Sequence, residues 1–535
     1  MLLKAIQFLK NIFSKPYSIS PKVILGHKYL KKNHDIEIIR RLKHRITITP
    51  IDDTRDYIFT KQFLLHINKN HEIILRQFLI SRLLDLSFEK AILKYFGSKK
   101  SSFLYPLPKI WQNLLTDEGI KVSRFSSLYF FCYSLAWFFY GIFYSLELFF
   151  FALKESLFLK SRITGNYSFF YKLNQLNFSS DENSSIISEF ISKKLVSPND
   201  TLLHDYKFSE NRQHHSSHSS YLKYIFISNI SSISLIPILF KIFWISFIAF
   251  LLLITGRKYP MLMVHAEIEG IFADYSFRKA RPDYIFFHNI NYAYKPLWVV
   301  IAEHYGACST LYYYSSNIFS FDNFYHAGMQ TMNWQQIYTW SNDQKTYLDN
   351  ATLNSCVTRI VGPIKFFYND PSTDLVLDGN NKKLLVGIFD VQPQRNTALT
   401  SLGFENNYYS YNTSKKFIAD IVKIFEGHPV DIIFKRKRDT RLADPRYVNF
   451  IKKLSKQKNF IEVNPSIDPE DIIQTVDLVI SMPHTSTALI GIKNKKPSMF
   501  YDSTGRLSDS PYNDVEIISS TKSLEDWVNK VIDSK

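Results

Sequence analysis

The chain has 535 residues, a formal net charge of +17 and a hydrophobic fraction of 46%. This length indicates two or three domains, and this hydrophobic fraction excludes a chain that is disordered throughout. The basic excess indicates an anionic partner, for which lipid headgroups, a nucleotide and nucleic acid are candidates. The three cysteines form no closely spaced pair, so the sequence indicates neither a disulfide framework nor a zinc site.

Two long apolar stretches occupy residues 128–153 and 225–254. Each is long enough to cross a bilayer, for which about 20 residues suffice. However, Glu147 interrupts the first stretch, and Pro237 and Lys241 divide the second into two shorter runs. Three interpretations stay open: membrane-spanning helices, monotopic helices at a membrane surface, and very apolar buried helices. We favour membrane contact of the monotopic or re-entrant kind over a pair of spans.

From about residue 260 onward, short apolar runs alternate with amphipathic ones. The expected strands are 261–264, 284–287, 309–314, 336–340, 359–361, 384–389, 430–434, 461–463, 478–480 and 497–501. The expected helices are 297–304, 414–425, 447–457, 469–474 and 486–493. This alternation predicts parallel sheets with helices on both faces, and a polar turn at 378–383 divides it into two units. A ligand of such a unit binds beyond the carboxyl ends of its strands.

The most informative segment is 477–491, where an apolar strand ends at Ser481 and Pro483 prevents the following helix from extending backwards. Three hydroxyl side chains stand where this helix begins: Thr485, Ser486 and Thr487. Free N–H groups and the positive end of the helix dipole make such a place an anion site. Plain capping of the helix by these hydroxyls is the alternative.

Residues 481–488, Ser-Met-Pro-His-Thr-Ser-Thr-Ala, resemble the signature of bacterial polysaccharide-biosynthesis proteins named for a Pro-Phe-Thr-Ser motif. His484 stands where that family has phenylalanine. The block is also similar to the motif that holds the nucleotide phosphate in sialyltransferase-like enzymes of the GT-B fold. Further family-like segments are 295–298, 312–317, 334–340 and 384–391, so the resemblance extends over residues 260–535.

This resemblance implies an α/β protein with two tandem Rossmann-like domains of the GT-B kind. Residues 260–376 would form the N-terminal, acceptor-side domain, and residues 383–535 the nucleotide-sugar domain. Residues 1–256 would precede them as a helical, membrane-associating region. The residues expected to bind the nucleotide through the motif are His484, Thr485, Ser486 and Thr487.

A cationic run follows the expected strand at 430–434 and includes Lys435, Lys437 and Arg438. Cations at the carboxyl end of such a strand suit a phosphate leaving group, because they offset the charge that develops as the sugar–phosphate bond breaks. Arg395, after the first strand of this domain, would point to the same cleft. A solvated basic turn is the alternative for the run.

A glycosyl acceptor needs a general base, which the GT-B resemblance places in the N-terminal Rossmann-like domain. His265, Glu267 and Glu269 follow the expected strand at 261–264, and His288 ends the next strand. Glu269 with the following glycine resembles the acidic-Gly motif that supplies the base in sialyltransferase-like enzymes. Ordinary surface or capping roles are the alternative for each.

No Asp-x-Asp triplet follows a strand in a setting that suggests a metal–diphosphate site, and no P-loop or HExxH motif occurs. We therefore expect a metal-independent glycosyltransferase without a cofactor, in which the nucleotide-sugar is a substrate. We expect the acceptor to be a lipid-linked glycan in a surface-polysaccharide pathway. We expect the protein on the cytoplasmic face of the plasma membrane, with no nucleic-acid partner. A teichoic-acid-type polyol-phosphate transferase and a non-catalytic membrane assembly protein are the rival interpretations.

Overall fold

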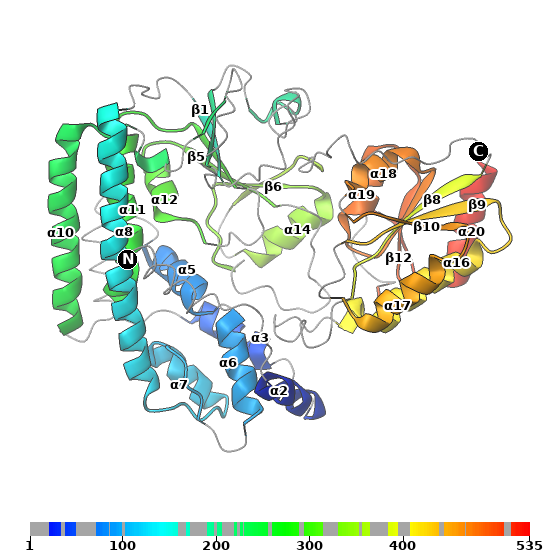
Figure 1. Ribbon diagram of the computed structural model, residues 1–535, viewed down its shortest axis with the longest axis horizontal. Helices are drawn as coiled ribbons and strands as arrows, with labels where there is room; N and C mark the ends of the chain where they lie inside the picture. Colours follow the sequence, from blue (N-terminus) through cyan, green and yellow to red (C-terminus); the bar gives the residue numbers. More distant parts are fainter. Residues whose placement is uncertain are drawn as a thin grey trace.

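The computed structural model consists of a helical N-terminal part and two α/β units, each built on a parallel sheet (Figure 1). It describes residues 21–33, 38–49, 71–84, 86–98, 102–158, 167–171, 190–196, 201–205, 219–221, 225–227, 229–254, 259–287, 294–313, 330–352, 356–363, 383–393, 407–437, 443–465, 467–507 and 515–534.

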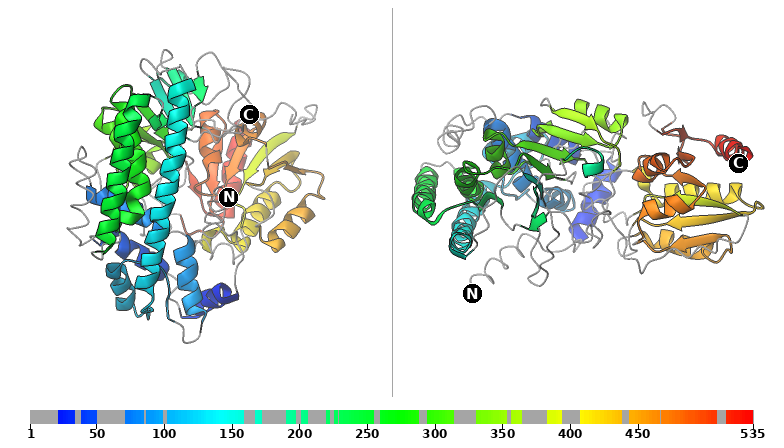
Figure 2. Two further views of the ribbon diagram at one scale, coloured as in Figure 1. Left: turned by 60° about the vertical axis from the view of Figure 1, so that its left-hand side comes forward. Right: turned by 90° about the horizontal axis from the view of Figure 1, so that it is seen from above.

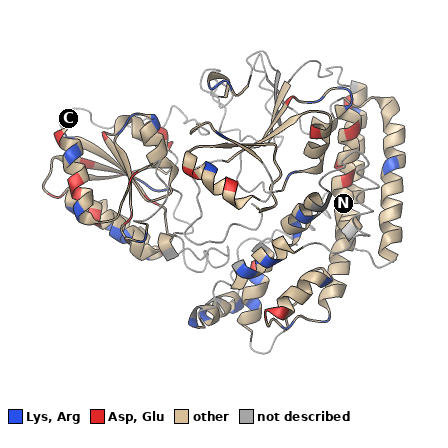
Figure 3. Cartoon of the chain, turned by 180° about the vertical axis from the view of Figure 1, so that it is seen from behind, with Lys and Arg blue, Asp and Glu red and all other residues tan. Residues whose placement is uncertain are grey.

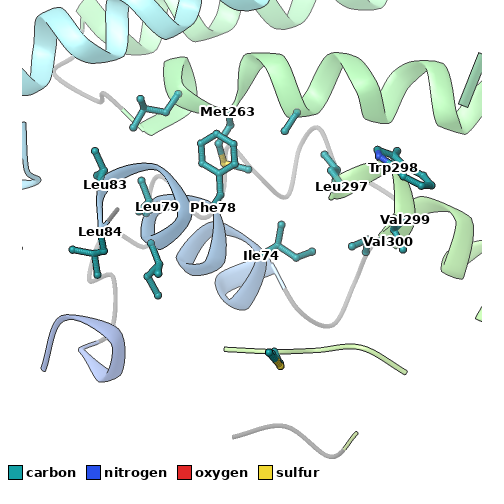
Figure 4. Packing of buried hydrophobic residues seen from close by; sticks show 14 of the residues in the cluster. Ile74, Phe78, Leu79, Leu83, Leu84, Met263, Leu297, Trp298, Val299 and Val300 are labelled. Carbon is teal, nitrogen blue, oxygen red and sulfur yellow. The ribbon is translucent and has the colours of Figure 1, made fainter. Parts of the chain in front are cut away.

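The described N-terminal helices share one hydrophobic core with the first α/β unit. These helices are α2 (Pro21–Lys32), α3 (Ile38–Ile48), α5 (His71–Leu83), α6 (Leu86–Phe96) and α7 (Lys109–Asp117). The close-up in Figure 4 places Phe78 of α5 beside Met263 of α11 (Tyr259–Phe277), with Leu297 of α12 (Leu297–His304) nearby. Because these buried side chains belong to a single cluster, the N-terminal helices are part of the first unit's body.

Two long apolar helices, α8 (Ser126–Phe158) and α10 (Ser232–Ile254), pack along α11. The Ser232 hydroxyl near the start of α10 donates to the Ser156 hydroxyl near the end of α8 over 3.2 Å, so these two helices run in opposite directions. A Cβ on Gly141 of α8 would lie 3.1 Å from the His265 amide nitrogen, which shows how closely α8 approaches α11. By length and composition alone, α8 and α10 could each cross a membrane.

The first sheet has seven parallel strands in the order β3-β2-β1-β4-β5-β6-β7. Their bounds are β1 (Tyr167–Tyr171), β2 (Thr201–Asp205), β3 (Ser219–Tyr221), β4 (Tyr284–Phe287), β5 (Cys308–Tyr312), β6 (Gln336–Thr339) and β7 (Val357–Ile360). Helix α14 (Asn342–Ala351) precedes β7, and its buried residues share the core with α11 and α12. The strand order reverses between β1 and β4, which places the topological switch point of this sheet there.

Two predictions about this unit are wrong. Residues 1–256 are not wholly helical, because β1, β2 and β3 join the first sheet. These strands are short, and a brief, doubly buried run such as Tyr167–Tyr171 has no period that marks it as a strand. Residues 261–264, expected as a strand, lie inside α11, because a four-residue apolar run cannot be told from a buried turn of helix.

The second sheet has six parallel strands in the order β10-β9-β8-β11-β12-β13. Their bounds are β8 (Leu384–Phe389), β9 (Val430–Lys435), β10 (Phe460–Val463), β11 (Leu478–Ser481), β12 (Ser498–Tyr501) and β13 (Ile517–Ile518). The helices of this unit are α16 (Tyr411–Ile424), α17 (Pro445–Leu454), α18 (Pro469–Thr475), α19 (Ser486–Lys493) and α20 (Thr521–Asp533). The strands and helices expected between 384 and 501 are therefore confirmed, with small shifts at their ends.

Alternate residues of these strands enter two cores, as the pleat of a strand requires. Ile432 and Phe434 pack with α16, α17 and α20 on one face, whereas Ile433 packs with α18 and with Ile490 of α19 on the other. The sheet is thus covered on both faces, and its switch point lies between β8 and β11.

The two units touch through α19, which Figure 1 places on the side of the second unit that faces the first. Leu489 and Ile490 pack against an aromatic cluster on the first sheet that includes Phe286 and Tyr338. The polar turn expected at 378–383 lies, apart from its last residue, outside the described residues.

Candidate functional site

Two loops meet at the switch point of the second sheet. One follows β8 and begins at Asp390, and the other runs from Met482 to the start of α19. The Met482 amide donates to the Phe389 carbonyl oxygen over 2.9 Å, and the Val391 amide lies 3.4 Å from the Met482 sulfur. These contacts fix the loops against each other at the carboxyl edge, where doubly wound sheets bind their ligands.

A strained turn directs the chain into α19. His484 has a φ of 60°, a left-handed backbone conformation that few residues other than glycine adopt. The Tyr409 hydroxyl donates to the Pro483 carbonyl oxygen over 3.0 Å, and the buried His484 ring lies 6.1 Å from the Phe500 ring. Burial lowers the pKa of His484 to about 4, against an opposing effect of Asp502, so its imidazole is neutral at pH 7. Strain of this kind is concentrated at functional sites.

The hydroxyl groups of the motif do not cap the helix that they precede. Thr485 donates its hydroxyl to the Met482 carbonyl oxygen over 2.8 Å, and no side chain caps the N-terminus of α19. The Thr487 hydroxyl lies 2.8 Å from that of Ser481 and 3.2 Å from that of Thr485. Plain capping is therefore not their role here, and the first N–H groups of α19 keep their capacity to bind an anion.

Ser486, the first residue of α19, differs from its neighbours. It is half-buried, and its hydroxyl has no hydrogen-bond partner among the described residues, whereas Thr485 and Thr487 are buried and bonded. Ser486 therefore provides a free donor at the positive end of the helix dipole.

Asp390 was not among the predicted site residues. Its Oδ2 accepts a hydrogen bond from the Tyr447 hydroxyl over 2.7 Å, and its Oδ1 is buried without a partner among the described residues. Burial raises the pKa of Asp390 to about 7, although the Tyr447 hydrogen bond and the charge of Arg436 both act to lower it. The available signal was its place directly after a buried strand of a parallel sheet.

The cationic run is only partly open to solvent. Lys435 is buried and donates from Nζ to the Pro465 carbonyl oxygen over 3.0 Å, and its burial lowers its pKa against the opposing charge of Asp468. Arg436 forms an ion pair with Glu462. Lys437 is exposed. Lys435 therefore holds the loop at Pro465 in place. Arg438 and Arg395 lie outside the described residues.

The predicted bases of the first unit lie in α11 under α8. The His265 ring stacks on the Tyr144 ring with centroids 4.4 Å apart, and the Tyr144 hydroxyl donates to Glu269 Oε1 over 3.0 Å. Burial, helped by the charge of Arg82, lowers the pKa of His265 to about 3. Burial raises the pKa of Glu267 to about 8.

These three residues do not lie with the second unit's motif. They belong to the side of the first sheet that packs on α11, whereas Leu489 and Ile490 of α19 contact the aromatic cluster on the opposite face. His288 directly follows β4 at the switch point of the first sheet but lies outside the described residues. Among the described residues, no group of three or more His, Cys, Asp or Glu side chains could hold a metal ion.

The geometry defines a class of protein with two parallel α/β units and a hydroxyl-rich loop at the switch point of the second. Residues 259–528 match the family model described as "Polysaccharide biosynthesis PFTS motif protein". This match spans half of the chain, so the protein belongs to this family, and the resemblance seen in residues 481–488 is confirmed.

No curated protein matches the sequence. Three solved structures show a distant likeness. The trehalose 6-phosphate synthase of Burkholderia multivorans is 7% identical with a TM-score of 0.39, and 70% of this chain and 92% of that chain are covered. The UDP-GlcNAc 2-epimerase of Methanocaldococcus jannaschii is 10% identical with a TM-score of 0.37, and the likeness covers 68% of this chain and 92% of that chain. A lipopolysaccharide outer core galactosyltransferase is 10% identical with a TM-score of 0.33, and the likeness covers 69% of this chain and 91% of that chain. Likeness this low assigns neither a reaction nor a substrate.

Proposed function

We propose that the protein is a glycosyltransferase of the GT-B kind that moves a sugar from a nucleotide-sugar donor to a glycan acceptor in polysaccharide biosynthesis. The observation that carries this proposal is the position of the Pro-His-Thr-Ser loop at the switch point of the second sheet, with α19 left uncapped. The family membership supports the pathway. The acceptor is a lipid-linked glycan in this proposal.

In the proposed reaction the bond between the anomeric carbon and the donor phosphate oxygen breaks, and the nucleotide leaves with the electron pair. The N–H groups at the start of α19 and the Ser486 hydroxyl would stabilise the charge on that phosphate. Lys437, whose charge acts on Asp390 in the loop after β8, would add to this in place of a metal ion. The acceptor oxygen forms the new glycosidic bond and loses its proton to a base, the role that we assign to His288.

The test is a titration of the purified chain with CMP-, UDP-, GDP- and CDP-linked ligands. We expect one nucleotide class to bind and Ser486→Asp to weaken it by about tenfold or more, since an added carboxylate repels the phosphate and tenfold is about 1.4 kcal/mol. The substitution itself suits the first turn of a helix, where negative charge is favourable, so the variant should fold.

Ser520→Asp is the matched control. Ser520 caps α20 in the same unit, where its hydroxyl accepts a hydrogen bond from the Ser523 amide over 3.0 Å, and it lies away from the switch point. Equal losses in both variants, or no nucleotide binding by folded protein, would overturn the proposal. Transfer of a phosphopolyol from a CDP-linked donor would instead support the polyol-phosphate transferase.

A further inference from the structure

Helix α10 carries large apolar side chains on its outer face along its whole length. Ile233 at its start is 83% exposed and Ile254 at its end is 69% exposed. Exposed residues between them recur every three or four positions, including Ile236, Phe240, Phe243 and Phe247. The opposite face packs into the core through residues such as Ile238. A surface helix of a soluble protein is normally polar on its outer face, so this helix is apolar on both.

Helix α8 extends the same surface. Leu128, Phe139, Leu146, Phe150 and Leu157 are exposed, at spacings that keep them on one side of the helix. Together, these side chains and the outer row of α10 form what we call the α8–α10 apolar face. A patch of this extent marks a site of interaction with a membrane or a partner.

The two charged residues in the middle of these helices, Lys241 and Glu147, lie off the α8–α10 apolar face. Lys241, the charged residue of α10, lies 3.5 Å from Asp274 of α11 and 4.8 Å from the centre of the Tyr275 ring. In Figure 3, α10 is accordingly tan except for one blue segment. Glu147 of α8 is exposed but borders Tyr140, on the flank that faces α11 rather than along the outer row.

Cations lie at both ends of the α8–α10 apolar face. Lys121 and Arg124 are exposed just before α8, and Lys154 is exposed near its C-terminal end. Lys279 is exposed and donates to the Ser231 hydroxyl at the start of α10 over 3.3 Å. Anionic headgroups complement this pattern, since each basic residue near such a surface is attracted to it. Two copies of the face would bring like charges together.

The packing of the two helices fixes their orientation toward a bilayer. Both lie lengthwise on α11, at the outer edge of the molecule in Figure 2, and α11 is covered in turn by α12 and the first sheet. If α10 crossed the bilayer, this body would lie at the same depth. Charged groups such as the Arg278–Asp274 pair, 2.7 Å apart, would then enter hydrocarbon.

We propose that the α8–α10 apolar face inserts in the plane of an anionic lipid surface, with both helices parallel to it and neither crossing it. The body of the protein then stays on one side of the membrane, and the side chains of the outer rows reach only the boundary between headgroups and acyl chains. This inference stands apart from the donor site, because binding to vesicles requires no nucleotide.

Partition of the full chain onto vesicles of phosphatidylcholine with phosphatidylglycerol tests the proposal. We expect binding that is weaker on vesicles of phosphatidylcholine alone, and a loss of about tenfold or more on combining Phe243→Ser with Phe247→Ser. The control combines Val357→Ser with Ile360→Ser, since these two residues are exposed in β7 and lie outside the α8–α10 apolar face. Circular dichroism and the urea midpoint, compared with the wild type, check that each variant is folded.

The depth of Trp244 separates in-plane insertion from crossing. Trp244 lies near the middle of α10 and is exposed. Subtraction of the fluorescence of Trp244→Phe isolates its signal, and quenching by lipids brominated at different depths locates it. Strongest quenching by shallow bromines is expected, whereas strongest quenching by the deepest ones would overturn the proposal. It would also fail if the chain did not bind vesicles, or if it formed dimers that the Phe243 and Phe247 substitutions abolish.

Discussion

Asp390 shows what one buried side chain contributes at the proposed site. Burial raises its pKa to about 7, far above the ordinary value of 3.8 for an aspartate. Between about pH 4 and pH 7 the folded protein therefore holds a proton that the unfolded chain has lost, so stability falls as pH rises through this window. Above about pH 7 this contribution stays constant.

Asp390→Asn should remove this part of the pH dependence. We expect the free energy of unfolding of this variant to fall less than that of the wild type between pH 5 and pH 8. The difference between the two falls should be on the order of 3 kcal/mol or less, because one pKa unit corresponds to about 1.4 kcal/mol. Urea unfolding at the two pH values measures this. Tyr447→Phe removes the hydrogen bond that holds the Asp390 pKa down, so it should extend the fall to higher pH. An unchanged slope in Asp390→Asn would contradict this account.

Sequence reasoning located the motif residues but not their bonding. The strand-to-helix turn at 481–486 follows from residue types alone, whereas the free Ser486 hydroxyl depends on Thr485 bonding backwards to Met482. Lys435 was expected to face the ligand. Because it lies two residues after Ile433, the pleat turns it to the α18 face of the sheet, where the loop at Pro465 receives it.

Helix α11 shows how the type of an element decides where candidate catalytic residues lie. As part of a strand, residues 261–264 would have led His265 and Glu267 to a sheet edge. In the helix, Glu267 is buried and His265 is partly buried under α8. Burial raises the pKa of Glu267 to about 8, so its side chain is mostly protonated at pH 7. A glutamine, which resembles the protonated carboxyl group in shape, should therefore fit at this position.

We expect Glu267→Gln to retain sugar transfer within a few-fold. We also expect it to stabilise the protein above pH 8, where the wild type must bury a charge. A general base would cost about 10²- to 10⁴-fold in rate when neutralised in this way. His288→Ala, by comparison, should show such a loss. Donor turnover and urea unfolding at pH 7 and pH 9 give both readouts, and a large loss in Glu267→Gln would return the base to α11.

At the scale of the whole molecule, the second unit was predictable from β8 to β12, whereas the first was predictable only from β4 onward, where the expected strands and the helix at 297–304 are confirmed with small shifts at their ends. Strands and helices between 384 and 501 alternate at short intervals, which is the pattern of a parallel sheet. In the first unit, β1 is separated from β4 by more than a hundred residues that include α10 and α11. Sequence patterns do not reveal that two strands so far apart in the chain pair with each other.

The contact between the units connects the motif to the proposed acceptor side. Leu489 and Ile490 follow Ser486 within one turn or so of α19 and pack on the first sheet. The helix that would hold the donor phosphate therefore also contacts the unit that would hold the acceptor. Under this proposal, donor binding and the relation between the units would be coupled through this one helix.

Amide hydrogen exchange of the full chain, with and without the nucleotide-sugar that binds best, tests the central claim most directly. We predict that the amides of residues 486–488 exchange more slowly when the donor is bound, because its phosphate accepts their hydrogen bonds. The first turn of α20, capped by Ser520, should exchange equally in both conditions. Slower exchange elsewhere in the chain, with residues 486–488 unchanged, would contradict the assignment of this loop as the donor site.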